Sequence, residues 1–194
     1  MPTQNEISLE CSLKHGLTQP ENIDVDFSDK VIMKNPVITF NKTYIIDGHH
    51  RWSEVLCINP DAKIVCLNYD ADISIIQMLK ATQGAIAASI DAIPVSNKKG
   101  YNIYKCSKKE ILDYIYSNIT NKVVEKIMSY KNNLKSKNDV VKYILANCEE
   151  LKNEHPILSN APDRDLMPQP YKTGKITDKE SALYKLKTGK VLKT

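Results

Sequence analysis

The sequence places four residues that suit phosphate binding, Gly48-His49-His50-Arg51, directly after Asp47 and between a β-rich segment and a helical one. A strand that turns at the glycine and opens directly into a helix leaves the first backbone amides without partners, and such a terminus attracts anions. Gly48 permits close backbone approach or a positive φ, while the Arg51 guanidinium and the two imidazoles add donors for phosphate oxygens. The run predicts a phosphate-binding turn formed by Gly48, His49, His50 and Arg51.

Asp47, directly before this run, does not suit a phosphate, because its carboxylate repels one unless a cation intervenes or it accepts a proton from a hydroxyl group. Its position predicts coordination of Mg²⁺ or general-base catalysis. Glu54 follows Arg51 by three residues on the same side of the expected helix, where it would orient Arg51 or help to hold the metal. Two structural alternatives stay open: Asp47 caps the helix, and one of the histidines points into the fold.

Short β-rich runs lead to this turn and short helices follow it. The polar pair Asn41-Lys42 predicts a hairpin between the two runs on either side of it. After Gly48, apolar residues recur with a helical period until the breaker Asn59-Pro60-Asp61. The order β-β-β-α-β-α is expected over residues 23–90, with strands at 31–33, 36–40, 43–46 and 63–69 and an amphipathic helix over 73–90.

The rest of the chain divides by composition. Three helices are expected over 107–119, 120–130 and 136–151. A Ser107–Glu110 capping box opens the first, and Ser136 and Asp139 mark the start of the third. We expect an α/β (α+β) fold with a small mixed sheet, a C-terminal helical section and a basic tail. Its parts are a lead-in with little structure and no function (1–21), a main domain (22–93), a helical section (101–154) and a Pro- and Lys-rich tail (155–194).

Charge and composition bound the function. The chain of 194 residues has a net charge of +4, but residues 1–80 carry −4 and the remainder +8, so the basic half is a candidate polyanion surface or simply a solvated one. No run is long and apolar enough for a membrane span, and no signal peptide is visible. We therefore expect no membrane partner and a cytoplasmic location, which would be the host cytoplasm if the protein is phage-encoded.

Cysteine and histidine spacing argues against several classes of site. The five cysteines form no C-x-x-C pair, and Cys57 and Cys66 lie on apolar patterns, so we expect reduced core thiols. The four histidines include no i, i+4 pair on a helix, which disfavours a simple zinc enzyme.

The run from Asn35-Pro36-Val37-Ile38 through Tyr44-Ile45-Ile46-Asp47-Gly48-His49-His50-Arg51-Trp52 resembles the ParB/sulfiredoxin superfamily, whose members place a G-x-x-R turn after such a strand and hairpin. The resemblance covers roughly residues 22–90, and its variant Asp-Gly-x-His-Arg is similar to that of ParB-like free serine kinases and ParB-like nucleases. It implies nucleotide binding at 48–51, with Asp47 near the metal or the transferred phosphoryl group. His49 replaces the cysteine of sulfiredoxins, and the arginine boxes of partition-type proteins are missing.

Three functions follow as hypotheses. The first is a nucleotide-binding phosphotransferase or NTPase that uses ATP, ADP or CTP with Mg²⁺ and acts on a small hydroxyl compound or a modified DNA base, with Arg164 brought to the site by a tail arm. The second is a ParB-like DNA-binding protein or nuclease, with Glu54, Asp70 or Asp72 joining Asp47 on a metal. Its backbone contacts would come from Lys172, Lys175, Lys179, Lys185, Lys187, Lys190 and Lys193. The third keeps the fold without an activity.

Overall fold

The computed structural model describes residues 1–90 and 101–162, and the chain divides into two compact units. The first unit comprises residues 1–70 and 99–161. In chain order its elements are α1 (Leu9–Thr18), α2 (Pro20–Asp26), β1 (Val37–Phe40), β2 (Tyr44–Asp47), α3 (His49–Ile58), β3 (Cys66–Tyr69), α5 (Lys108–Asn118), α6 (Asn121–Tyr130) and α7 (Lys137–Glu154). The fold is therefore mixed α+β with a small mixed sheet, as expected.

Helix α1 overturns the expectation that residues 1–21 are a lead-in with little structure. Leu9, Leu13 and Leu17 recur every four residues on one helical face, and each is at most 4% exposed. The Ser8 side chain caps this helix by accepting a hydrogen bond from the Cys11 amide. The three leucines span fewer than three helical turns, so their spacing alone is a weak helix signal. The helix is stabilised because other elements of the unit bury this face.

The sheet has the strand order β2-β1-β3, with β1 antiparallel to β2 and parallel to β3. Asn41 (φ 47°) and Lys42 (φ 57°) are both left-handed, and the Thr43 amide donates to the Phe40 carbonyl at 3.1 Å. That is the geometry of a type I′ turn, which matches the twist of the strands it joins and confirms the predicted hairpin. The strand expected at 31–33 is wrong: Val31 makes one isolated bridge with Ile64.

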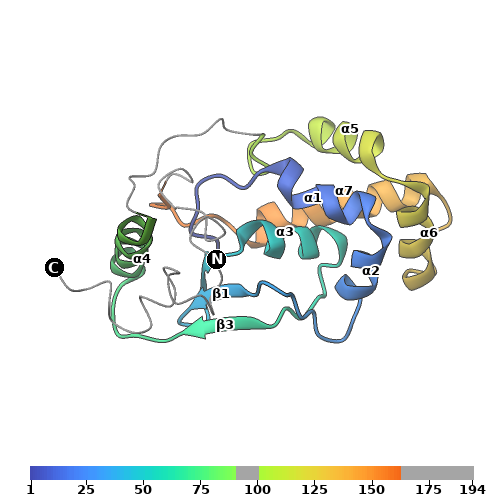
Figure 1. The fold of residues 1–194 in the computed structure, drawn as a ribbon. Helices are drawn as coiled ribbons and strands as arrows, with labels where there is room; N and C mark the ends of the chain where they lie inside the picture. The colour runs from blue at the N-terminus through green and yellow to red at the C-terminus, as the bar shows by residue number, and fades with distance from the viewer. Residues whose placement is uncertain (91–100, 163–194) are drawn as a thin grey trace. The chain divides into compact units, whose positions relative to one another are not determined.

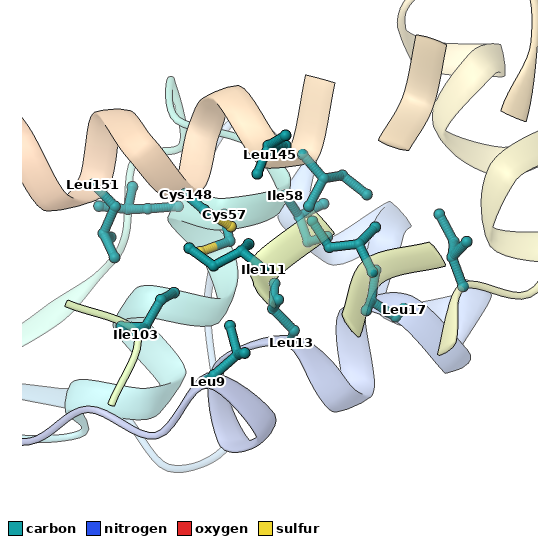
Figure 2. Close-up of a cluster of buried hydrophobic side chains, with 14 of the residues drawn as sticks. Leu9, Leu13, Leu17, Cys57, Ile58, Ile103, Ile111, Leu145, Cys148 and Leu151 are labelled. Carbon is teal, nitrogen blue, oxygen red and sulfur yellow. The ribbon is translucent and has the colours of Figure 1, made fainter. Parts of the chain in front are cut away.

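Helix α3 lies between the sheet and helices α1 and α7, and it packs against both of these helices (Figure 1). Figure 2 shows the core that results, in which Leu13, Cys57 and Ile111 come together from three helices, each with no exposed surface. Helices α1 and α3 approach closely at Gly16, where an added Cβ would lie 2.7 Å from Ile58 Cγ1. Such a tightly packed core fixes the position of α3, and therefore also the position of the turn before its first residue.

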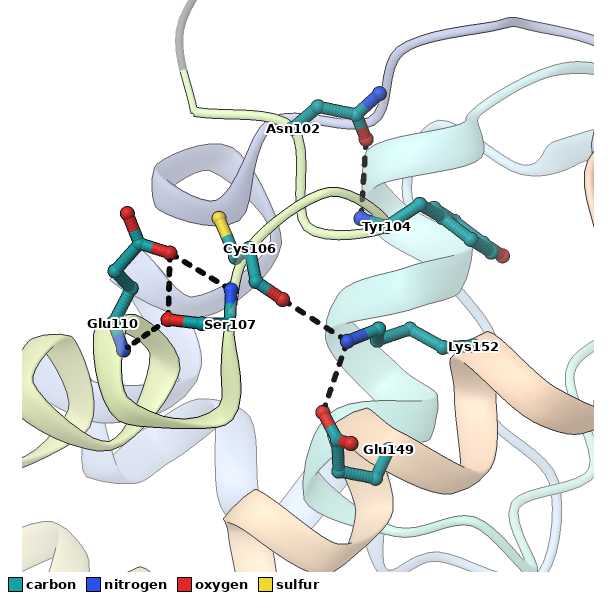
Figure 3. A network of polar contacts seen from close by, with 7 residues as sticks. All are labelled: Asn102, Tyr104, Cys106, Ser107, Glu110, Glu149 and Lys152. Carbon is teal, nitrogen blue, oxygen red and sulfur yellow. Dashed lines mark hydrogen bonds and ion pairs between the residues drawn. The ribbon is translucent and has the colours of Figure 1, made fainter.

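The helical section predicted for the C-terminal half is confirmed, including its start signals. Ser107 and Glu110 form the reciprocal capping box, and the Ser136 side chain accepts from the Asp139 amide at the start of α7. Figure 3 shows how α7 joins this capped start: Lys152 Nζ donates to the Cys106 carbonyl at 3.1 Å and pairs with Glu149 at 3.0 Å.

In the second unit, residues 71–98 and 162–194, the described part contains helix α4 (Ile75–Ile90), which agrees with the helix expected over 73–90. Ser74 and Gln77 cap its start reciprocally. In the part of the chain that the structure describes, no helix combines the length and the apolar character needed to cross a membrane.

Candidate phosphate-binding turn

The turn between β2 and α3 depends on Gly48. Its φ is +86°, and a Cβ added there would lie 2.9 Å from Arg51 Nη2 and 3.1 Å from the Val37 Cα. A positive φ strains any residue with a side chain, and the backbone contact leaves little room for one. Just before the glycine a β-bulge lies between Ile45 and Asp47, so that Asp47 is placed opposite Ile38. Bulges of this kind redirect side chains at the ends of strands.

The N-terminus of α3 is not capped by a side chain. Gly48 is the N-cap residue and makes no side-chain cap hydrogen bond, and its carbonyl accepts the first helical bond from the Trp52 amide at 2.9 Å. Asp47 does not cap the helix, so the structural alternative for this residue is wrong. A helix start without a side-chain cap carries the positive end of the helix dipole and presents amide donors, which is the arrangement predicted from the sequence.

Arg51 lies in the first turn of α3, and its side chain contacts the last residue of β2 and the residue before β1. Its Nη2 donates to Asp47 Oδ2 and to the Pro36 carbonyl, both at 3.1 Å. The Arg51 and Asp47 side chains are 37% and 28% exposed, and a partly solvated pair of this kind contributes about 0.2–1 kcal/mol. Arg51 Nε is buried and has no hydrogen-bond partner within residues 1–90 and 101–162. The guanidinium is therefore held by one carboxylate and one carbonyl oxygen, both of which a bound phosphate could replace as acceptors.

The His49 side chain points into the fold, which confirms the open alternative that one histidine does so. It is 5% exposed, its Nε2 accepts from the Thr3 amide at 3.1 Å, and the ring also donates to the Ile45 carbonyl. Burial, helped by the neighbouring His50, lowers the pKa of His49 to about 3. The ring is neutral, so the expectation that its side chain donates to a phosphate is wrong for His49.

The His50 side chain also binds the N-terminal segment: its Nε2 accepts from the Ser8 amide at 3.0 Å. An imidazole nitrogen that accepts from a backbone amide carries no proton, so Nε2 is not a donor to phosphate here. Both imidazoles thus anchor residues 3–8, the segment for which no function was expected. No pattern in the sequence indicates this, because a backbone amide leaves no signature in residue types.

Glu54 lies away from Arg51. Its side chain accepts a hydrogen bond from the Gly16 backbone, and burial together with the charge of Asp26 raises the pKa of Glu54 to about 8. Asp26 is itself 5% exposed, and burial raises its pKa to about 7. Glu54 therefore belongs to the packing of α1, α2 and α3, and the expected role in orienting Arg51 or holding metal beside Asp47 is wrong.

The structure does not describe all of the remaining predicted ligands. Arg164 and the lysines of the tail lie outside the described residues. Within residues 1–90 and 101–162, no group of three His, Cys, Asp or Glu side chains is arranged to hold a metal ion. Of the predicted side chains, those of Asp47 and Arg51 contact each other beside the backbone of residues 48–51.

A polar network fixes the N-terminal segment beside the turn. The Asn102 side chain donates to the Asn5 carbonyl at 3.0 Å, and its Oδ1 accepts from the Ile7 and Tyr104 amides. The buried hydroxyls of Ser12 and Ser53 lie 2.7 Å apart and join α1 to α3. These residues were missed by the sequence analysis, and they support the turn rather than form it.

Comparison of the chain with protein-family models, with curated proteins and with solved structures gives no match.

Proposed function

We propose that the turn from Asp47 to Arg51 binds the phosphates of a nucleotide and that the protein is a phosphotransferase or NTPase of the ParB/sulfiredoxin type. The observation that carries the proposal is the start of α3, where a left-handed Gly48 opens a helix with no side-chain cap and Arg51 stands in its first turn. Backbone amides, a helix dipole and a guanidinium that converge on one point favour an anion.

Asp47 gives the proposed site a requirement for a cation. Without ligand, its carboxylate accepts from Arg51, so an incoming phosphate competes with it for the guanidinium and is repelled by its charge. Asp47 would hold Mg²⁺ together with a bound nucleotide, and the charge of the ion would relieve both effects. Mg²⁺ sites of this kind use one or two carboxylates, the substrate phosphates and water, so Asp47 alone is a sufficient protein ligand.

The chemistry we propose is phosphoryl transfer, to a hydroxyl group of a small compound or a modified DNA base or to water. This reaction depends mainly on positioning and on stabilising charge on the transferred group. Arg51 and the amides of residues 48–51 would stabilise that charge, and Asp47 would hold Mg²⁺ or accept the proton of the attacking hydroxyl. His49 would contribute through its backbone amide, because its ring is buried and its Nε2 accepts from Thr3. His50 would hold the N-terminal segment beside the turn through its bond with Ser8.

The test is calorimetric titration of ATP, ADP and CTP into the protein, with and without Mg²⁺. Arg51→Ala should weaken nucleotide binding at least about tenfold, since a charged hydrogen bond contributes about 1.5–3 kcal/mol. Lys14→Ala is the matched control, because Lys14 is an exposed cation on α1 that contacts neither Asp47 nor Pro36. Absence of binding by every nucleotide would refute the proposal.

Asp47→Asn separates the two effects of the carboxylate. It removes the negative charge and weakens the contact with Arg51, so binding of a nucleotide without Mg²⁺ should strengthen while the gain from added Mg²⁺ disappears. Equal dependence on Mg²⁺ in the wild type and the variant would show that Asp47 is not the ligand. Analysis of released phosphate in the same mixtures decides between a nucleotide binder and an enzyme.

DNA binding by a ParB-like protein or nuclease is the alternative. The lysines on which it depends lie outside the described residues. If no nucleotide binds, salt-dependent affinity for duplex DNA is the property to measure next.

A further inference from the structure

Strand β3 forms one end of the sheet, and no described strand pairs with its outer side. Two hydrogen bonds fix the direction of its backbone: the Val65 amide donates to the Val31 carbonyl at 2.9 Å, and the Tyr69 carbonyl accepts from the Asn41 amide at 2.8 Å. Asn41 directly follows β1, so odd-numbered residues of this stretch direct their backbone groups toward β1. Because these directions alternate along a strand, the amides and carbonyls of Cys66 and Asn68 point outward.

Within residues 64–69, this outer edge lacks the residue types that usually protect an edge against pairing. Edge strands in monomeric proteins commonly carry a lysine, a proline or a bulge. Residues 64–69 read Ile-Val-Cys-Leu-Asn-Tyr, with no charged residue and no proline. The edge therefore presents donors and acceptors of its own backbone with no side chain that would repel a second strand.

An apolar stripe runs along the same strand. Val65, Leu67 and Tyr69 alternate onto one face and are 42%, 47% and 46% exposed. Isolated apolar residues on a surface need no explanation, but three in a row along an unpaired edge form a patch of the kind that marks an interaction site.

We propose that a second copy of this chain pairs with this edge, so that two β3 strands run antiparallel about a two-fold axis at Leu67. In this register Leu67 faces the partner's Leu67, Val65 faces the partner's Tyr69, and the outward backbone groups of Cys66 meet those of the partner's Asn68. Side chains of facing residues lie on the same side of an antiparallel pair, so the three apolar residues of each copy bury one another.

The strand fits a copy of itself in this register better than in the neighbouring ones. Moving the axis to Cys66 places Tyr69 against the partner's Lys63, and moving it to Asn68 places Val65 against the partner's Ala71. Only the axis at Leu67 covers all three exposed apolar side chains. A contact of this size lies at the small end of protein interfaces, so the dimer should be reversible and dependent on concentration.

The proposed dimer goes beyond the proposed nucleotide site and is independent of it. The sheet order β2-β1-β3 puts the turn that follows β2 at the opposite edge from β3. A variant that no longer dimerises can therefore still be titrated with nucleotide, and a failure to bind nucleotide would leave the dimer proposal untouched.

Sedimentation velocity over a wide range of protein concentrations tests the dimer. The wild type should shift from monomer to dimer as concentration rises, and Leu67→Glu, which sets two like charges against each other at the axis, should raise the dimer Kd at least about tenfold. Val25→Glu is the matched control, because Val25 is an apolar residue of α2 with a similar exposure of 41%. A monomer at every concentration, or a dimer that Leu67→Glu leaves unchanged, would overturn the proposal.

Cross-linking tests the register without depending on the charged variant. Facing residues of a non-hydrogen-bonded antiparallel pair have Cα atoms about 4.5 Å apart, within disulfide range. Leu67→Cys should therefore form an interchain disulfide when copper-phenanthroline and oxygen take up the two electrons and two protons of the thiols. Val65→Cys should not exceed the wild-type background, to which Cys11 and Cys66 contribute. Equal cross-linking at both positions would refute the register.

Discussion

Replacing Asp26 with asparagine should stabilise the protein, and more so at alkaline than at acidic pH. Asp26 lies on α2 with 5% of its surface exposed, and its Oδ2 has no hydrogen-bond partner among the residues that the structure describes. Its backbone carbonyl is bound by the Asn59 side chain, which fixes the residue in place. An ionised carboxylate in such a place has lost water without gaining a partner, and for this reason the pKa of Asp26 is raised to about 7.

The sign follows from proton linkage. Below the unfolded pKa of about 3.8 both states are protonated, and Asp26 contributes no penalty. As pH rises from there to about 7, the unfolded chain ionises while the folded chain keeps its proton, so stability falls by up to about 1.4 kcal/mol per pH unit. Asparagine keeps the shape of the protonated acid and removes this loss.

The magnitude is bounded by the same shift. A rise of about three units corresponds to a ceiling of about 4 kcal/mol, and relaxation around the ionised group reduces it, so we expect Asp26→Asn to gain about 1–3 kcal/mol more at about pH 8 than at about pH 5. Glu54 is a titratable neighbour of Asp26, and loss of the Asp26 charge should also lower the pKa of Glu54.

The assay is urea denaturation of the wild type and Asp26→Asn at both pH values. Asp24→Asn is the control, because Asp24 is an exposed acid of the same helix whose pKa is lowered by hydrogen bonds from Lys126 and Tyr130. Its replacement should not stabilise the protein at either pH. If the gain from Asp26→Asn is the same at both pH values, or if the variant is less stable at alkaline pH, the reasoning about Asp26 is wrong.

Three further predictions concern the turn and its support. Gly48→Ala should lower the free energy of unfolding by about 1–3 kcal/mol and weaken nucleotide binding, because of the positive φ and the contact of the added Cβ with Val37. Chemical denaturation would measure the first effect and calorimetry the second. His49→Gln should lower the free energy of unfolding by about 1–2 kcal/mol less at about pH 5 than at about pH 7. The reason is that the folded pKa is about 3, so the wild type loses stability as the unfolded imidazole protonates below its ordinary 6.5. An equal effect of the variant at both pH values would contradict this. Asn102→Ala should lower stability by about 1–3 kcal/mol and speed amide hydrogen exchange in residues 3–8 more than in α6, because it leaves the Ile7 amide and the Asn5 carbonyl without this partner.

Much of the local structure followed from the sequence because its causes lie within a few residues. The Ser107–Glu110 box, the Ser136 cap, the turn at Asn41-Lys42 and the stop at Asn59 are each satisfied by neighbours along the chain. The left-handed Gly48 between a strand and a helix belongs to the same class. These features required no knowledge of what packs against them, so composition and spacing were sufficient.

Prediction failed where a segment depended on a distant surface. Residues 31–33 have β-branched and apolar side chains, but they make only the bridge between Val31 and Ile64, and Ile32 is 71% exposed. Residues 1–21 were read as unstructured although α1 carries three core leucines, because a stripe of three positions becomes a helix only when another element buries it.

The sequence by itself determined the strand, glycine and helix that make the turn, and it identified Arg51 as the residue with the right chemistry in the first turn. Only the tertiary structure decided the partners of the other polar residues: Thr3 and Ser8 for the two histidines, Gly16 and Asp26 for Glu54, and Pro36 as the second acceptor for Arg51. The physical reason is that a helix or a turn is closed by hydrogen bonds over at most a few residues, whereas the surroundings of a side chain depend on which distant surfaces burial brings together.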